Sequence, residues 1–243
     1  MSYYAATRHP WACLVFLVPL LAAYEFGVLW LGGPNAIAYR NGADAWLRWG
    51  LERYGFGQVF AAPALIVGIF LVRSFLGWKD RPTNLFAVTF GMLVESLVFA
   101  ILLWMISRNF LLLLDQAGVN LLQLPPAPSA AGPIITYVGA GIYEEVIFRL
   151  GLFSIAAFLL QMLLFPKPFA YTLAAVAAAL VFAGAHHIGP YGESPIKPEV
   201  FLFRVCAGLF FTALYVFRGF GIAVGAHAGY DILVGVVLQP QQV

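Results

Sequence analysis

The segment LFAVTFGMLVESLVFAILLWMI, residues 85–106, decides the fold class of this chain. Its only ionisable side chain is that of Glu95. About 20 apolar residues in an α-helix cross the hydrocarbon core of a bilayer, whereas an open strand would leave its backbone groups without hydrogen-bond partners in lipid. The segment therefore predicts a membrane-spanning helix.

The same apolar pattern recurs along the chain. The sequence is 62% hydrophobic and 10% charged, whereas an ordinary soluble domain is about 25% charged. We therefore expect an all-α, polytopic transmembrane bundle of about seven spans, within a range of six to eight. The candidate spans are residues 11–31, 59–78, 85–106, 133–165, 169–186, 200–217 and 220–238. The fourth segment is long enough for one tilted helix or for an additional eighth helix.

The composition also limits the location and the partners of the protein. We expect residues 1–243 to form a single integral membrane domain of the cell (inner) membrane, with the bilayer as its surroundings. The first span is longer than the apolar region of a signal peptide and carries Glu25, so we expect a retained anchor. The net charge is +2 without a basic run, which gives nucleic acid no electrostatic footprint. Cys13 and Cys206 lie in apolar stretches and are expected to be buried free thiols.

Three features lie between the spans. Residues 44–53 alternate tryptophans with charges and predict an interfacial amphipathic helix. The proline-rich loops at residues 123–129 and 189–198 bracket the segments that carry most of the unusual polar side chains.

Ionisable side chains inside apolar spans are costly and are therefore candidates for function. Glu144, Glu145 and Arg149 lie within two turns of the fourth span. Glu145 and Arg149 have the spacing of a helical ion pair, so we expect them to support the structure of the site. Glu144 has no basic residue three or four positions later and is left free to accept a proton from water.

Three histidines lie in the late spans. His186 ends the fifth span, and His227 and Asp231 lie one turn apart in the seventh. His187 is about 100° away from His186 on a helix, so we assign it to a solvated span end.

Small residues accompany these groups. Gly221, Gly225 and Gly229 form a stripe facing away from His227 and predict close helix packing. We expect His9 to lie at the interface and Arg73 to snorkel. Glu25 and Glu95 look isolated on the early spans, and we expect them to be polar packing residues.

The ordered motifs Glu144-Glu145-x-x-x-Arg149, Phe182-x-x-x-His186 and His227-x-x-x-Asp231 resemble those of the CPBP (Abi) family of intramembrane proteases, which includes the type II CAAX prenyl endopeptidases. The resemblance covers residues 132–238. It implies that Glu144 activates water with help from His186, and that His227 and the residue four positions later stabilise an oxyanion. The last motif usually ends in Asn. Asp231 cannot donate an amide hydrogen bond, so it would instead orient His227 and favour its imidazolium form.

A zinc site is the alternative arrangement of the same side chains. His186, His227 and Glu144 would make a His₂Glu set with an open position for water. The sequence has no HExxH motif, and the family resembles a glutamate-dependent protease more than a zinc enzyme. We therefore expect no metal and no other cofactor.

The sequence favours an intramembrane endopeptidase that cleaves a membrane-anchored or lipid-modified protein or peptide. A proton- or cation-coupled transporter is an alternative, with Glu25, Glu95, Glu144 and the histidines forming a relay. A non-catalytic immunity protein is another, although it would have no reason to keep these costly charges in lipid. A buried hydrogen-bonded network without chemistry is the structural alternative. The oligomeric state stays open.

Overall fold

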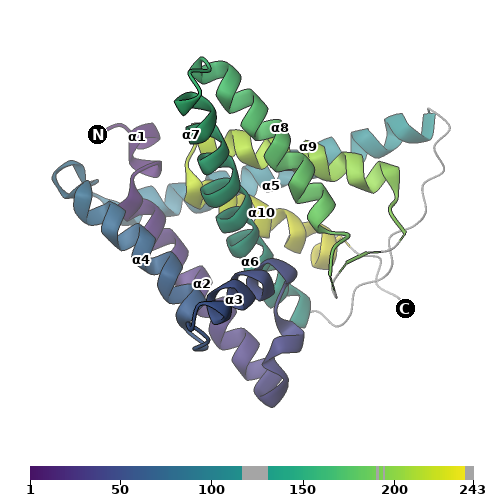
Figure 1. Cartoon of the computed structure of the whole chain (residues 1–243), viewed down its shortest axis with the longest axis horizontal. Coiled ribbons are helices and arrows are strands. Elements are labelled where there is room, and N and C mark those ends of the chain that lie inside the picture. Colours follow the sequence, from purple (N-terminus) through teal and green to yellow (C-terminus); the bar gives the residue numbers. More distant parts are fainter. Residues whose placement is uncertain (117–130, 190–191, 194, 239–243) are drawn as a thin grey trace.

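The apolar segments form helices in the computed structural model, which describes residues 1–116, 131–189, 192–193 and 195–238 (Figure 1). All regular elements in these residues are helical. They are α1 (Tyr3–Thr7), α2 (Pro10–Gly32), η1 (Gly33–Tyr39), α3 (Gly42–Arg53), α4 (Ala61–Leu76), η2 (Trp78–Asp80), α5 (Leu85–Gln116), α6 (Ala131–Glu145), η3 (Val146–Phe153), α7 (Ser154–Met162), α8 (Lys167–Ala185), α9 (Pro198–Phe217), α10 (Phe220–Ile232) and η4 (Leu233–Val237). The predicted loop at residues 123–129 lies outside the described residues.

Six helical segments are long and apolar enough to cross a membrane, so the protein is a multi-pass membrane protein. They are Pro10–Ile37, Leu85–Phe110, Gly132–Met162, Lys167–Ala185, Pro198–Phe217 and Phe220–Val237. The remaining predicted span, residues 59–78, forms α4, which is apolar but has only 16 residues. The polytopic helical bundle predicted from the composition is confirmed.

The fourth apolar segment forms one continuous helical span rather than two helices. Helix α6 runs into the π-helix η3, and η3 runs into α7. Beyond α7, Leu164 has a φ of +64° and Pro166 follows shortly. A left-handed residue and a nearby proline do not continue an α-helix, so the span ends there.

Helix α10 lies at the centre of the bundle and contacts α2, α5, α6 and α9 (Figure 1). Its predicted glycine stripe packs against α5, where Gly221, Gly225 and Gly229 face Met92, Ser96 and Ala100 respectively. On the α6 side, a Cβ added to Gly141 would lie 2.8 Å from the backbone nitrogen of Ala228. These close approaches bring the motif residues of α6 and α10 together.

Helix α3 forms at residues 42–53 and includes residues 44–53, for which a helix was predicted, but some of its charged side chains are buried. Asp44 is fully buried and pairs with Arg40 and Arg48, both of which also contact Glu25. The hydroxyl of Tyr143 in α6 donates to Glu25 Oε1 at 2.6 Å. The expectation that Glu25 is isolated was wrong, because its partners come from segments distant in the sequence.

Glu95 is also paired. Arg218 Nη2 lies 2.8 Å from Glu95 Oε2, and the Tyr3 hydroxyl donates to the same oxygen at 2.9 Å. Both early glutamates therefore connect helices, which is the packing role expected of them. Both cysteines are free as predicted, with Cys13 buried and Cys206 only partly buried.

Candidate active site

The carboxylates of the first motif lie where α6 changes into the π-helix η3. Glu144 and Glu145 are the last residues of α6, and Arg149 lies in η3. The Ser154 amide closes the π-helical turn by donating to the Arg149 carbonyl, which also accepts from the Ser154 hydroxyl at 2.9 Å. Short π-helical turns inside α-helices occur frequently at functional sites.

Glu145, Arg149 and His227 form the fully buried part of the site. Arg149 Nη1 lies 3.0 Å from Glu145 Oε1, so the ion pair expected from the spacing is present. His227 Nδ1 lies 2.8 Å from the same oxygen. Since a carboxylate accepts, Nδ1 carries the hydrogen. Arg149 Nη2 donates to the Gly208 carbonyl at 3.2 Å and so connects α9 to the site.

Glu144 is the point at which the three motifs meet. Its Oε2 atom lies 3.9 Å from His186 Nε2 and 3.7 Å from His227 Nε2. These distances exceed a direct hydrogen bond, and Oε2 has no hydrogen-bond partner among the described residues. One carboxylate oxygen therefore faces two imidazole nitrogens at distances that a bridging water can span.

The two histidines are held so that both Nε2 atoms face Glu144. His186 Nδ1 donates to the Phe182 carbonyl at 2.9 Å, and His227 Nδ1 donates to Glu145. The hydrogen positions follow from the acceptors, because a carbonyl and a carboxylate cannot donate.

Asp231 lies on the same side of His227 as Glu144. Its Oδ2 atom is 3.6 Å from His227 Nε2. The sequence suggested that Asp231 orients His227, whereas in the structure Glu145 makes the orienting hydrogen bond. Asp231 is therefore placed to interact with a group that binds at His227 Nε2.

Aromatic rings surround the buried imidazole and guanidinium groups. The Phe211 ring stacks on His227 with a centroid distance of 4.3 Å and an interplanar angle of 13°. Arg149 lies over the Phe182 ring at 4.5 Å, and the same ring meets His186 edge-on at 4.9 Å. Phe182, the phenylalanine of the second motif, thus contacts both the buried Arg149 and the more exposed His186.

The site has a buried part and a partly exposed part. The side chains of Arg149 and Glu145 are 1% and 0% exposed. Those of Glu144, His186 and Asp231 are 14%, 25% and 24% exposed. Water or a substrate segment can therefore reach the three outer side chains, while the inner pair stays dry.

A loop after α8 borders this partly exposed part. His187 Nδ1 donates to the Glu193 carbonyl at 2.8 Å, and the Glu193 amide donates to the His186 carbonyl at 2.8 Å. His187 therefore fixes the loop and does not join the Glu144 group. Burial raises the pKa of Glu193, but the hydrogen bond and charge of Arg204 outweigh burial and hold the pKa below its usual range.

The sequence did not predict the contacts that the site residues make with other helices and loops. The bond from Glu145 to His227, the Phe211 ring and the Glu193–Arg204 pair join residues of different helices or loops. None has a spacing signal in the sequence.

The side chains proposed for the zinc alternative do not adopt the spacing of metal ligands. Within the part of the chain that the structure describes, no three His, Cys, Asp or Glu side chains are grouped as a set that could hold a metal ion. A reaction without metal stays a prediction, to be tested by metal analysis.

One comparison with known proteins matches this site. The family model described as "Type II CAAX prenyl endopeptidase Rce1-like" matches residues 126–233, which include all three motifs. No curated protein and no solved structure matches the chain.

Proposed function

Because residues 126–233 match the model of the type II CAAX prenyl endopeptidase Rce1-like family, we propose that this chain is an intramembrane endopeptidase in which Glu144 activates the attacking water. The observation that carries the proposal is the position of Glu144 Oε2, which lies within 3.9 Å of two imidazole nitrogens and lacks a hydrogen-bond partner in the described residues. A general base needs an oxygen that no other donor already occupies.

The water lies between Glu144 and His186. Glu144 Oε2 accepts one proton from it as the water oxygen bonds to the carbonyl carbon of the scissile peptide. His186 orients the water, because its Nδ1 hydrogen is held by the Phe182 carbonyl and its Nε2 faces Glu144. Glu144 then transfers the proton to the leaving nitrogen as the C–N bond breaks.

His227 stabilises the charge that develops on the carbonyl oxygen. When its imidazole is doubly protonated, Nδ1–H bonds to Glu145 and Nε2–H is available to the oxyanion. Asp231 lies 3.6 Å from the same Nε2 and provides a second carboxylate near the imidazolium. Glu145, itself paired with Arg149, has the position of the carboxylate that orients the histidine in a serine-protease triad.

The location of the site supports a membrane-anchored class of substrate. Glu144 and His227 belong to membrane-spanning segments, so the scissile bond must enter from the bilayer or its interface. A membrane-anchored or lipid-modified protein or peptide meets this condition. The site borders the loop that follows α8, at the partly exposed part described above.

A transporter receives less support from the contacts. A relay through the early spans would use Glu25 and Glu95, but each forms ion pairs with arginine. Neither glutamate contacts Glu144 among the interactions of the described residues.

The proposal is tested on the termini of membrane proteins in cells. Cells with the wild-type protein should contain new protein termini that are missing from cells with Glu144→Ala, quantified by mass spectrometry of terminal peptides. Glu52→Ala, which changes an exposed glutamate of α3, is the matched control and should give the wild-type termini. Identical terminal peptides in wild-type and Glu144→Ala cells, at equal protein levels, would overturn the proposal.

A further inference from the structure

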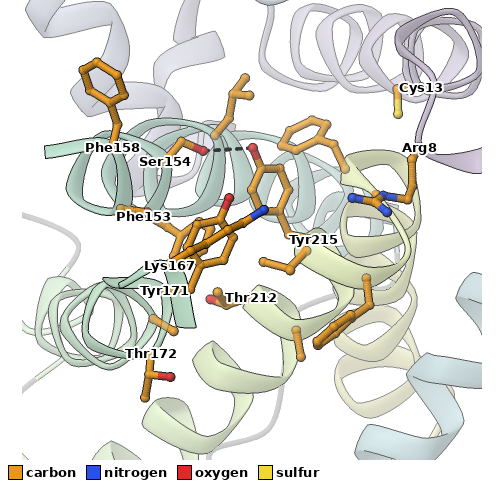
Figure 2. A pocket seen from close by; sticks show the side chains of 18 of the residues that line it. Arg8, Cys13, Phe153, Ser154, Phe158, Lys167, Tyr171, Thr172, Thr212 and Tyr215 are labelled. Carbon is orange, nitrogen blue, oxygen red and sulfur yellow. Dashed lines mark hydrogen bonds between the residues drawn. The ribbon is translucent and has the colours of Figure 1, made fainter. Parts of the chain in front are cut away.

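A large pocket lies at the other side of the bundle from the loop that borders the active site. Its volume is about 1030 Å³, and it is lined by residues of α1, α2, α4, η3, α7, α8, α9 and α10, some of which Figure 2 labels. None of Glu144, His186, His227 and Asp231 lines it. It is therefore a second site, separate from the catalytic group.

All the charged side chains that line this pocket are basic. Arg8, Arg73 and Lys167 line it, and its described lining includes no Asp or Glu. Lys167 Nζ lies 5.3 Å from the centroid of the Tyr171 ring. Arg8 and Lys167 approach the pocket from opposite walls (Figure 2). Among the described residues, none of the three cations forms an ion pair.

Other basic side chains of the described bundle do have acidic partners. Arg40, Arg48, Arg149, Arg204 and Arg218 each contact a carboxylate. Cations next to a cavity without a counter-ion attract an anionic group, and most strongly in a partly desolvated place.

The three cations lie in or next to the end turns of apolar helices. Arg8 precedes α2, Arg73 is in the last turn of α4, and Lys167 begins α8. These are ends of apolar helices, where basic side chains reach the lipid headgroup region. An anion bound by them would therefore lie at the depth of a phosphate.

Several phenylalanine side chains line the rest of the pocket, together with polar side chains such as Gln161, Thr172 and Thr212, and the pocket extends to the exposed surface of the helices. Phe153 lies in its wall, and Phe158 and Phe217 at its edge are 60% and 61% exposed. The one polar contact drawn inside it is the hydrogen bond between Ser154 and Tyr215, at 2.9 Å (Figure 2). A molecule that fills this space needs an anionic head and an apolar tail.

We propose that this pocket binds one anionic phospholipid of the surrounding bilayer, with its phosphate against Arg8, Arg73 and Lys167 and an acyl chain along the phenylalanine wall. The volume is slightly larger than the range of about 300–1,000 Å³ that is usual for ligand pockets, which suits a headgroup and part of one chain. The exposed edge lets the chain enter from the bilayer without crossing the helices.

The test uses purified protein in detergent micelles and measures retained lipid by native mass spectrometry. The probes are phosphatidylglycerol and phosphatidylcholine with identical chains. Wild-type protein should retain one phosphatidylglycerol in preference to phosphatidylcholine. Arg8→Gln with Lys167→Gln should weaken phosphatidylglycerol binding about 25-fold, at roughly fivefold for each basic side chain.

Two control variants separate the pocket from general attraction. Lys79→Gln with Arg81→Gln removes the same charge near the end of α4 but outside the pocket, and should leave retention unchanged. Ala213→Phe fills the apolar part and keeps every cation, and should also reduce retention. Equal binding of both lipids, or equal loss in the two double variants, would overturn the proposal.

Two further probes identify the source of the anion. Glycerol phosphate, which has the head without the tail, should not displace the phospholipid at the same concentration. A prenylated cysteine peptide should not displace it either. Displacement by the peptide alone would assign the pocket to substrate and overturn the lipid proposal, whereas displacement by glycerol phosphate would reduce it to a phosphate site.

Discussion

Replacement of Arg149 by methionine should strongly destabilise the protein. Arg149 is 1% exposed and contacts Glu145, which is 0% exposed, so the replacement leaves a buried carboxylate with His227 as its remaining partner. Removing one member of a buried ion pair costs about 3–5 kcal/mol. For a chain of this size that corresponds to a lower unfolding midpoint by roughly 10 °C.

The double variant Glu145→Gln with Arg149→Met should recover most of the lost stability. The glutamine keeps an uncharged oxygen that accepts the His227 Nδ1 hydrogen, and no unpaired buried charge remains. The assay is thermal unfolding in nanodiscs, followed by tryptophan fluorescence. Arg108→Met, at an exposed position of α5, is the control and should lower the midpoint little. An Arg149→Met midpoint equal to that of wild type, or a double variant no better than the single one, would refute the reasoning.

Purified protein should contain less than one zinc per chain and should cleave after chelator treatment; a tightly held zinc whose removal abolishes cleavage would contradict this. Asp231→Asn should retain activity in a cleavage assay, because Asn keeps a side-chain oxygen and adds an N–H donor. Glu25→Ala should lower the unfolding midpoint more than Glu25→Gln, because only Gln keeps an acceptor for the Tyr143 hydroxyl. Since the pKa of Glu193 is lowered, its pairing with Arg204 stabilises the loop above the usual carboxyl pKa of about 4.3 and is lost as pH falls through the lowered value. Arg204→Gln should raise that pKa in an NMR titration.

The helical spans and the residues of the candidate site could be predicted because both leave local patterns in the sequence. An apolar run of about 20 residues indicates a span, and the i,i+4 spacings indicate which side chains share a helix face. Glu144, His186, His227 and Asp231 were found in this way, and the structure brings them together.

Contacts between helices were not predictable in the same way. Glu145 and His227 are 82 residues apart, and Glu25 and Tyr143 are 118 apart. Which carboxylate contacts which imidazole depends on how α6 and α10 pack, and a single sequence carries no signal for that choice. The lining of the pocket proposed to bind lipid comes from the ends of several helices, so it could not be predicted from the sequence either.

The central claim is that Glu144 is the general base, and turnover by Glu144→Gln protein tests it most directly. Glutamine keeps the size of the side chain but cannot accept the proton, so it should abolish cleavage with little change in fold or substrate binding. The assay follows a membrane-anchored reporter in proteoliposomes without an ion gradient, with Glu52→Gln as the matched control. The account predicts wild-type cleavage by the control and none by Glu144→Gln, whereas equal turnover by all three proteins would contradict it.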